Sequence, residues 1–195
     1  MRARLALAAS GVQVELREIL LRDKPSAFLA ASPSGTVPCL QTGQDIVDES
    51  LDIMIWALRQ NDPDHWLDMP TAGHDLITCA DGPFKTALDH TKYASRYPDL
   101  DADAERQTAA TFLYDLDTQL SGTSFLFADH ATLADMAILP FVRQFAFIDK
   151  AWFDAQPWPH LLAWLERFLA SAAFAVIMPK YPPWVAGEPP TFFPN

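Results

Sequence analysis

The chain has 195 residues, half of them hydrophobic and a fifth charged, which is typical of a globular protein with one large domain or two smaller ones. Its 14 basic and 25 acidic side chains give a net charge of −11, which opposes binding to phosphate backbones. The longest candidate apolar run, residues 170–178, is far shorter than the roughly 20 residues that span a bilayer. The first residues also lack the cleavage pattern of a secretory signal. These features predict a cytoplasmic protein that binds neither nucleic acid nor membranes.

Cysteine and histidine give no sign of a metal site. Cys39 and Cys79 form neither a C-x-x-C motif nor a metal-ligand pair, and two cysteines do not make a disulfide framework. The five histidines show no ligand spacing. We therefore expect no metal, and we interpret both cysteines as packing residues.

The first part of the chain, up to about residue 61, mixes helical and strand-like patterns. Good helix formers over residues 2–10 precede Gly11, the residue type that most often ends a helix. The pattern continues with a strand at 12–16, a short helix after Pro25, strands at 37–40 and 45–47, and a helix at 49–59. This order predicts a small α/β domain over residues 1–62 that begins on a helix, followed by a polar linker at 61–64.

From about residue 72 onward almost every segment has the pattern of an amphipathic helix. We predict an all-α domain over residues 72–195, with helices at 84–96, 104–120, 132–147 and 158–170. Pro140 falls inside the third of these helices and should kink it. The proline-rich end, residues 181–194, should be extended rather than helical.

Two features of the first domain could bind a ligand. A cis peptide at Val37-Pro38 would turn the backbone N–H and C=O of Val37 outward to pair with a bound peptide, although an ordinary strand-initiating proline explains the dipeptide equally well. In Asp48-Glu49-Ser50, Glu49 and the helix N-terminus at Ser50 could hold a zwitterionic amino-acid head. Simple capping by Ser50 is the plainer explanation.

Two further positions have plain interpretations from the residues alone. Lys24 precedes a proline, and nothing nearby distinguishes it from a solvated surface lysine. Thr132 and Asp135 have the spacing of a capping box, in which each side chain bonds the backbone N–H of the other residue. This motif marks the start of a helix and is structural.

Taken together, these segments resemble the glutathione transferase family. The runs at residues 1–7, 21–25, 32–38 and 48–50 resemble its thioredoxin-like half, with the omega-like and bacterial branch the most similar, and those at 132–137 and 140–145 resemble its all-helical half. The resemblance covers nearly the whole chain. It implies a thioredoxin-like N-terminal domain joined to an all-α C-terminal domain.

The resemblance also implies roles for the residues singled out above. Val37 would meet the cysteinyl backbone of glutathione and Pro38 would be the cis-proline that exposes it. Glu49 and Ser50 would hold the γ-glutamyl end, and Lys24 would pair with the glycyl carboxylate. The cosubstrate would be a small apolar electrophile or a disulfide, the protein would be a homodimer, and its activity would serve detoxification.

One departure from the family pattern concerns the start of the chain. The family opens with a strand, followed by a catalytic Cys, Ser or Tyr at the N-terminal end of the first helix, where the helix N-terminus stabilises a thiolate. In this branch that motif stands immediately before the residues that match Met1 to Arg4. We therefore expect the strand and the catalytic residue upstream of Met1. Conjugation of glutathione or thiol-disulfide exchange is the expected activity, with a non-catalytic binding or regulatory protein as the alternative.

Overall fold

The computed structural model describes all 195 residues, which form two compact units. Unit 1 consists of Met1–His65 and Ser171–Asn195, and unit 2 consists of Trp66–Ala170. The first boundary lies inside the gap between the predicted domains. The second differs from the prediction, which placed residues 171–195 in the helical domain. The structure assigns this segment to unit 1 because its helix and its strand pack on unit 1.

Two helices that pack against each other form the core of unit 1. Helix α1 (Arg2–Ser10) ends at Gly11, whose φ of 68° is in the left-handed region, as the sequence predicts. It packs against α3 (Ser50–Gln60). Four residues of these two helices are at most 1% exposed, namely Leu5, Ala6, Met54 and Ala57. Alanine on both helices allows their backbones to approach closely.

The central hairpin of unit 1 pairs β2 (Leu40–Thr42) with β3 (Asp45–Val47) in antiparallel register, with Leu40 opposite Val47. Gly43 forms the turn between them with a φ of 67°. The sequence predicted the first strand at residues 37–40, whereas the ladder begins only at Leu40. A proline at position 38 has no N–H to donate to a ladder, which accounts for the later start.

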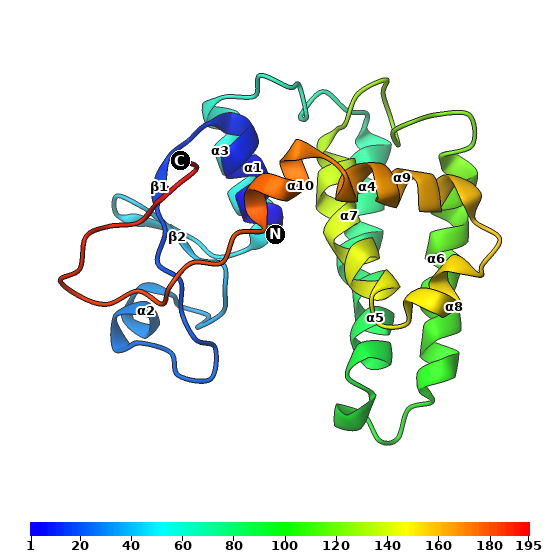
Figure 1. The fold of residues 1–195 in the computed structure, drawn as a ribbon, viewed down its shortest axis with the longest axis horizontal. Coiled ribbons are helices and arrows are strands. Elements are labelled where there is room, and N and C mark those ends of the chain that lie inside the picture. Colours follow the sequence, from blue (N-terminus) through cyan, green and yellow to red (C-terminus); the bar gives the residue numbers. More distant parts are fainter. The chain divides into compact units, whose positions relative to one another are not determined.

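The chain returns to unit 1 after it leaves unit 2. Helix α10 (Ala172–Ile177) packs against α1, and β4 (Phe192–Phe193) pairs antiparallel with β1 (Val14–Glu15). Figure 1 shows this red C-terminal segment running beside the blue β1. The strands therefore form two separate pairs, β1 with β4 and β2 with β3. The predicted extended tail is confirmed, and its pairing with β1 explains why it belongs to unit 1. A short helix, α2 (Ser26–Ala31), has no buried residue.

Unit 2 is helical throughout. Its helices are α4 (Thr71–Cys79), α5 (Lys85–Lys92), α6 (Ala102–Gln119), α7 (Leu133–Ala146), α8 (Lys150–Asp154) and α9 (Pro159–Leu169). A π-helical turn, Ala80–Phe84, joins α4 to α5 around Pro83, and a 3₁₀ turn, Ala94–Arg96, follows α5. The predicted helix at 84–96 is thus divided. No helix of the chain is both long enough and apolar enough to cross a membrane.

The capping box at the start of α7 forms as predicted. Asp135 is completely buried, and its Oδ2 accepts from the Thr132 N–H at 2.9 Å and the Thr132 hydroxyl at 2.8 Å. Its Oδ1 accepts from the Leu126 N–H and the Trp164 indole N–H, both at 3.0 Å. One carboxyl group therefore joins the preceding loop, the start of α7 and the middle of α9. Helix α7 continues through Pro140 without a break.

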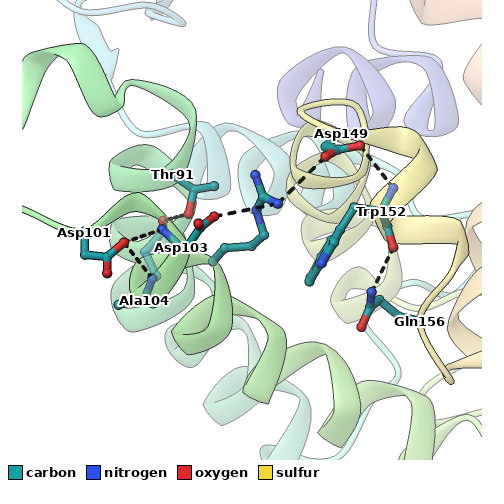
Figure 2. A network of polar contacts seen from close by, with 9 residues as sticks. Thr91, Asp101, Asp103, Ala104, Asp149, Trp152 and Gln156 are labelled. Atoms are coloured by element: carbon teal, nitrogen blue, oxygen red, sulfur yellow. Dashed lines mark hydrogen bonds and ion pairs between the residues drawn. The ribbon is translucent and has the colours of Figure 1, made fainter.

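Helices α6 and α8 begin with aspartate caps that lie in one polar network (Figure 2). Asp101 accepts from the Asp103 N–H at 2.9 Å, and Asp149 accepts from the Trp152 N–H at 3.0 Å. The Arg106 guanidinium lies 3.9 Å from the carboxylate of Asp103, 3.8 Å from that of Asp149 and 5.1 Å from the Trp152 ring. This arginine links the first turn of α6 to the start of α8.

Candidate functional site

All five residues that the sequence assigns to ligand binding lie in unit 1, on loops around α2 and at the start of α3. Lys24 is exposed and precedes α2, and its Nζ donates to the Gly35 carbonyl at 2.9 Å. Gly35 has a φ of 64°, in the left-handed region, where a side chain would be strained. Lys24 therefore crosses from the start of α2 to the turn that follows this helix.

Asp48 connects that turn to the residues that precede α3. Its Oδ1 accepts from the Ser32 hydroxyl at 3.2 Å and its Oδ2 accepts from the Ser34 N–H at 3.2 Å. Hydrogen bonds from Ser34 and then from Ser32 hold the pKa of the Asp48 carboxyl below its ordinary value. The turn at 32–36 is thereby fixed beside Glu49 and Ser50, because both follow Asp48 directly in the chain.

The Val37–Pro38 peptide bond is cis, in the form that the ligand-binding interpretation requires. The Val37 side chain is 45% exposed. Its position between the 32–36 turn and β2 places it in the segment that Asp48 fixes. The cis geometry therefore belongs to the same loop region as Lys24 and Asp48.

The start of α3 differs in detail from the prediction. Glu49, not Ser50, is the N-cap residue, with extended backbone angles (φ −90°, ψ 139°), and no side chain caps the helix. The first helical hydrogen bond runs from the Ile53 N–H to the Glu49 carbonyl at 2.9 Å. The N–H groups of the first turn have no carbonyl partner within the helix, and this positive end is suited to an anion. The exposed Glu49 carboxylate stands beside it.

The two cysteines differ in exposure, and only one of them contradicts the interpretation as packing residues. Cys39 is half-buried next to Pro38, and burial is the main reason that its thiol pKa is raised, with a hydrogen bond to Asp48 second. A thiol with a raised pKa is a poor nucleophile at neutral pH. Cys79 is exposed at the end of α4, so the packing interpretation is wrong for it.

The sequence did not reveal the part that Asp48, Ser32 and Ser34 play. Asp48 stood in a run already singled out, but its partners lie 14 and 16 positions earlier in the chain. Only the folded loop brings them together. No group of three or more His, Cys, Asp and Glu side chains is placed to hold a metal ion.

Family comparisons fit both units. Residues 1–66 match the model "Glutathione S-transferase, N-terminal domain" and residues 99–167 match "Glutathione S-transferase, C-terminal domain". Together the two models cover more than half of the chain, so the chain belongs to the glutathione S-transferase family. A search of curated protein sequences finds no significant match.

Solved structures of glutathione transferases share the fold. Glutathione S-transferase III in its apo form has 24% sequence identity and a TM-score of 0.70, with 93% of each chain covered. A family member from Pseudomonas fluorescens Pf-5, solved with two glutathione molecules bound, has 18% identity and a TM-score of 0.74, with 89% of this chain and 85% of that chain covered. Glutathione transferase F7 from Populus trichocarpa has 20% identity and a TM-score of 0.73, with 89% and 90% covered. At sequence identities below 25%, this similarity shows that the chains share a fold, and it does not by itself assign a function.

Proposed function

We propose that this protein is a glutathione-binding transferase that holds the tripeptide along the Lys24, Val37–Pro38 and Glu49–Ser50 segments of unit 1. The observation that carries the proposal is the Asp48 carboxylate, which ties the 32–36 turn to the start of α3. Lys24 is bonded to that same turn. Three segments that are far apart in sequence thereby form one polar region with an exposed cation, an exposed carboxylate and a helix N-terminus.

Each part of glutathione has a chemically suitable partner in this arrangement. The ammonium of the γ-glutamyl group would pair with Glu49, and its carboxylate would accept from the Ser50 hydroxyl and the first N–H groups of α3. The cysteinyl backbone would exchange hydrogen bonds with Val37 in the manner of an added strand. The glycyl carboxylate would pair with Lys24, which would then give up its bond to the Gly35 carbonyl.

The reaction that follows is nucleophilic attack by the bound glutathione sulfur. In conjugation the thiolate forms a bond to an electrophilic carbon, and the leaving group departs with its electron pair. With a disulfide cosubstrate, the thiolate forms a mixed disulfide and releases the other sulfur as a thiolate. We assign no catalytic side chain within residues 1–195. We place the protein in the cytoplasm as a homodimer that detoxifies small apolar electrophiles or reduces disulfides.

A second candidate function, glutathione binding without turnover, is favoured by Cys39. This cysteine adjoins Pro38 in the proposed site, yet its raised thiol pKa makes it unsuitable as a nucleophile in exchange. A chlorodinitrobenzene conjugation assay on the protein separates the two candidates. Turnover excludes the non-catalytic alternative, and binding without turnover supports it.

Thermal shift with glutathione tests the binding itself. A ligand at about 100 times its Kd stabilises the folded state by about 2.7 kcal/mol, so millimolar glutathione should raise the Tm by several degrees. Glu49→Gln and Lys24→Met each remove one charged contact and should weaken binding roughly tenfold. Glu188→Gln and Lys180→Met are matched controls on exposed residues of unit 1 and should bind as the parent does. A Tm that does not respond to glutathione contradicts the proposal.

A further inference from the structure

The turn at residues 32–36 is closed by hydrogen bonds among its own residues. The Gly35 N–H donates to the Ser32 carbonyl at 3.2 Å, and the Thr36 N–H donates to the Ser34 hydroxyl at 3.1 Å. The hydroxyl groups of Ser34 and Thr36 lie 2.6 Å apart and share a further hydrogen bond. Because these bonds connect its residues to one another, the turn should move as one body. A contact that places part of the turn therefore places the whole of it.

Asp48 links this turn to the start of α3. Its carboxylate accepts from the Ser32 hydroxyl and from the Ser34 N–H, both at 3.2 Å, and the Cys39 thiol bonds the same carboxylate. A carboxylate has about four acceptor positions, so these three donors occupy most of them. The bonding capacity of Asp48 is thus used largely within the protein.

The neighbouring acid, Glu49, is in a different situation. Its side chain is exposed and caps no backbone group of α3, so its carboxylate is available to a ligand. Two consecutive acidic residues therefore have different parts in the proposed site. Glu49 is placed to contact the ligand, whereas Asp48 acts through the turn that it holds.

The far end of the turn leads directly into the cis Val37–Pro38 peptide. Because Val37 follows the turn in the chain, a displacement of the turn also displaces the backbone N–H and C=O of Val37. Lys24 is bonded to the same turn through the Gly35 carbonyl at 2.9 Å. The turn thus connects the residues proposed for the cysteinyl and glycyl parts of the ligand. Asp48 joins it to the residues proposed for the γ-glutamyl part.

We propose that Asp48 is a positioning residue that keeps these two halves of the glutathione site in register, so that the site selects a molecule with both a γ-glutamyl head and a cysteinyl backbone over either fragment alone. This inference rests on the proposed function. A ligand that bridges two subsites gains affinity from the second contact only when the separation of the subsites matches its own length. Fixing that separation before binding also avoids the cost of ordering a loop during binding.

The first experiment compares three ligands on the parent and on Asp48→Ala by NMR titration. Glutathione bridges the two halves, L-glutamine supplies the γ-glutamyl head alone, and cysteinylglycine supplies the remainder. We expect Asp48→Ala to weaken glutathione binding about tenfold and to change the Kd of each fragment by less than about twofold. Each half of the site stays intact in this variant, while the register between the halves is lost. Asp45→Ala alters an exposed aspartate of β3 and is the matched control, which should leave all three Kd values unchanged.

Asp48→Asn separates positioning from charge. The asparagine carbonyl can still accept from the Ser34 N–H, and its amide can donate to the Ser32 hydroxyl oxygen, so the turn stays attached. Glutathione should therefore bind Asp48→Asn with an affinity within about threefold of that of the parent. If asparagine weakens glutathione binding as much as alanine does, the negative charge itself is required and the positioning role is wrong.

Ser32→Ala tests the same link from the side of the turn, and it applies even if Asp48→Ala does not fold. It removes the hydroxyl that donates to Asp48 and should weaken glutathione binding about threefold, with little change for either fragment. Because both substitutions break one connection, the double variant should bind glutathione as Asp48→Ala does. Losses that add in full contradict the proposed link.

The outcomes distinguish this inference from the function on which it rests. A parent that binds no glutathione overturns the proposed function together with this inference. Glutathione binding to Asp48→Ala that stays within about twofold of the parent overturns the inference alone. Equal weakening of glutathione and of either fragment also overturns it, because the substitution then damages one half of the site rather than the register between the halves.

Discussion

Asp135 shows how one buried acid can organise a helical unit. Its carboxyl group accepts four hydrogen bonds from a loop, from the start of α7 and from α9, and water does not reach it. Burying a polar group costs free energy unless its hydrogen bonds are restored, and here every donor is neutral. Burial is the largest influence on this group and raises its pKa above the ordinary 3.8, while the hydrogen bonds from Thr132, Leu126 and Trp164 act in the opposite direction.

The raised pKa of Asp135 predicts a pH dependence of stability. The folded state binds this proton more tightly than the unfolded state, so the stabilisation is complete below about pH 3.8 and is lost as pH rises through the folded pKa. Asp135→Asn does not titrate and leaves at least one donor without an acceptor, which costs about 1–3 kcal/mol. Urea unfolding should therefore show that the variant is less stable than the parent at neutral pH. The difference between their free energies of unfolding, here called the gap, should widen as the pH is lowered toward 4.

The exposed linker residue Asp64 provides the control for this measurement. The free energy of unfolding of Asp64→Asn should differ little from that of the parent at neutral pH, because the Asp64 side chain is exposed to solvent. If the gap between the parent and Asp135→Asn narrows on acidification, the folded pKa is below the ordinary value and the assigned effect of burial is wrong.

At the scale of single elements, two glycines with no distant neighbour in the way should respond differently to alanine. Apart from its two chain neighbours, a Cβ at Gly43 or at Gly82 would meet no atom within 4 Å. Gly43 has a φ of 67° in the β2–β3 turn, so Gly43→Ala should destabilise by about 1 kcal/mol through strain alone. Gly82 lies in the helical turn before α5, where alanine gains helix propensity but its Cβ meets the ring of Pro83, so Gly82→Ala should change the stability by less than about 0.5 kcal/mol.

Paired denaturant midpoints measure both changes with the parent as reference. Because neither substitution adds a contact beyond the chain neighbours, the difference between the two midpoints reports on local backbone conformation rather than on tertiary packing. Destabilisation by both alanines to the same extent would show that conformation is not the cause.

The elements that the sequence predicts well are those with local signals. Helix α1 ends at its glycine, and α7 begins at its capping box, because each signal acts within four residues. Helices α4, α8 and α10 were not predicted. The α4 segment contains Gly73 and β-branched residues, and α8 and α10 are only 5 and 6 residues long, too short for a periodic pattern. The pairing of β4 with β1 joins residues nearly 180 positions apart, and no local pattern encodes it.

The candidate site was predictable in part for the same reason. Lys24, Val37, Pro38, Glu49 and Ser50 were named from motifs that resemble a family. The cis geometry of the Val37–Pro38 peptide is confirmed, whereas the N-cap moved from Ser50 to Glu49. The Asp48 bonds that unite the segments depend on a turn whose conformation is set only in the folded chain.

For the whole molecule, the net charge of −11 is large enough to affect stability. Like charges repel more strongly in the compact state than in the expanded unfolded chain, and salt screens this repulsion over a Debye length of about 10 Å at 0.1 M. We expect the Tm to rise as sodium chloride is added to a low-salt buffer. Each kcal/mol of repulsion that the salt removes should raise the Tm by about 2–4 °C. A Tm that falls with added salt would show that the ion pairs, such as Arg4 with Glu18, outweigh the net repulsion.

The return of the chain to unit 1 also sets the order in which the protein can be completed on the ribosome. Unit 2 is one continuous stretch, so all of its residues are translated before those of α10 and β4. Unit 1 can be completed only after Phe193 has been translated, because this residue is buried in unit 1. At about 5–20 residues per second, β1 is translated on the order of ten seconds or more before the β4 residues that pair with it. The β1–β4 pair therefore cannot form until well after β1 itself has been made.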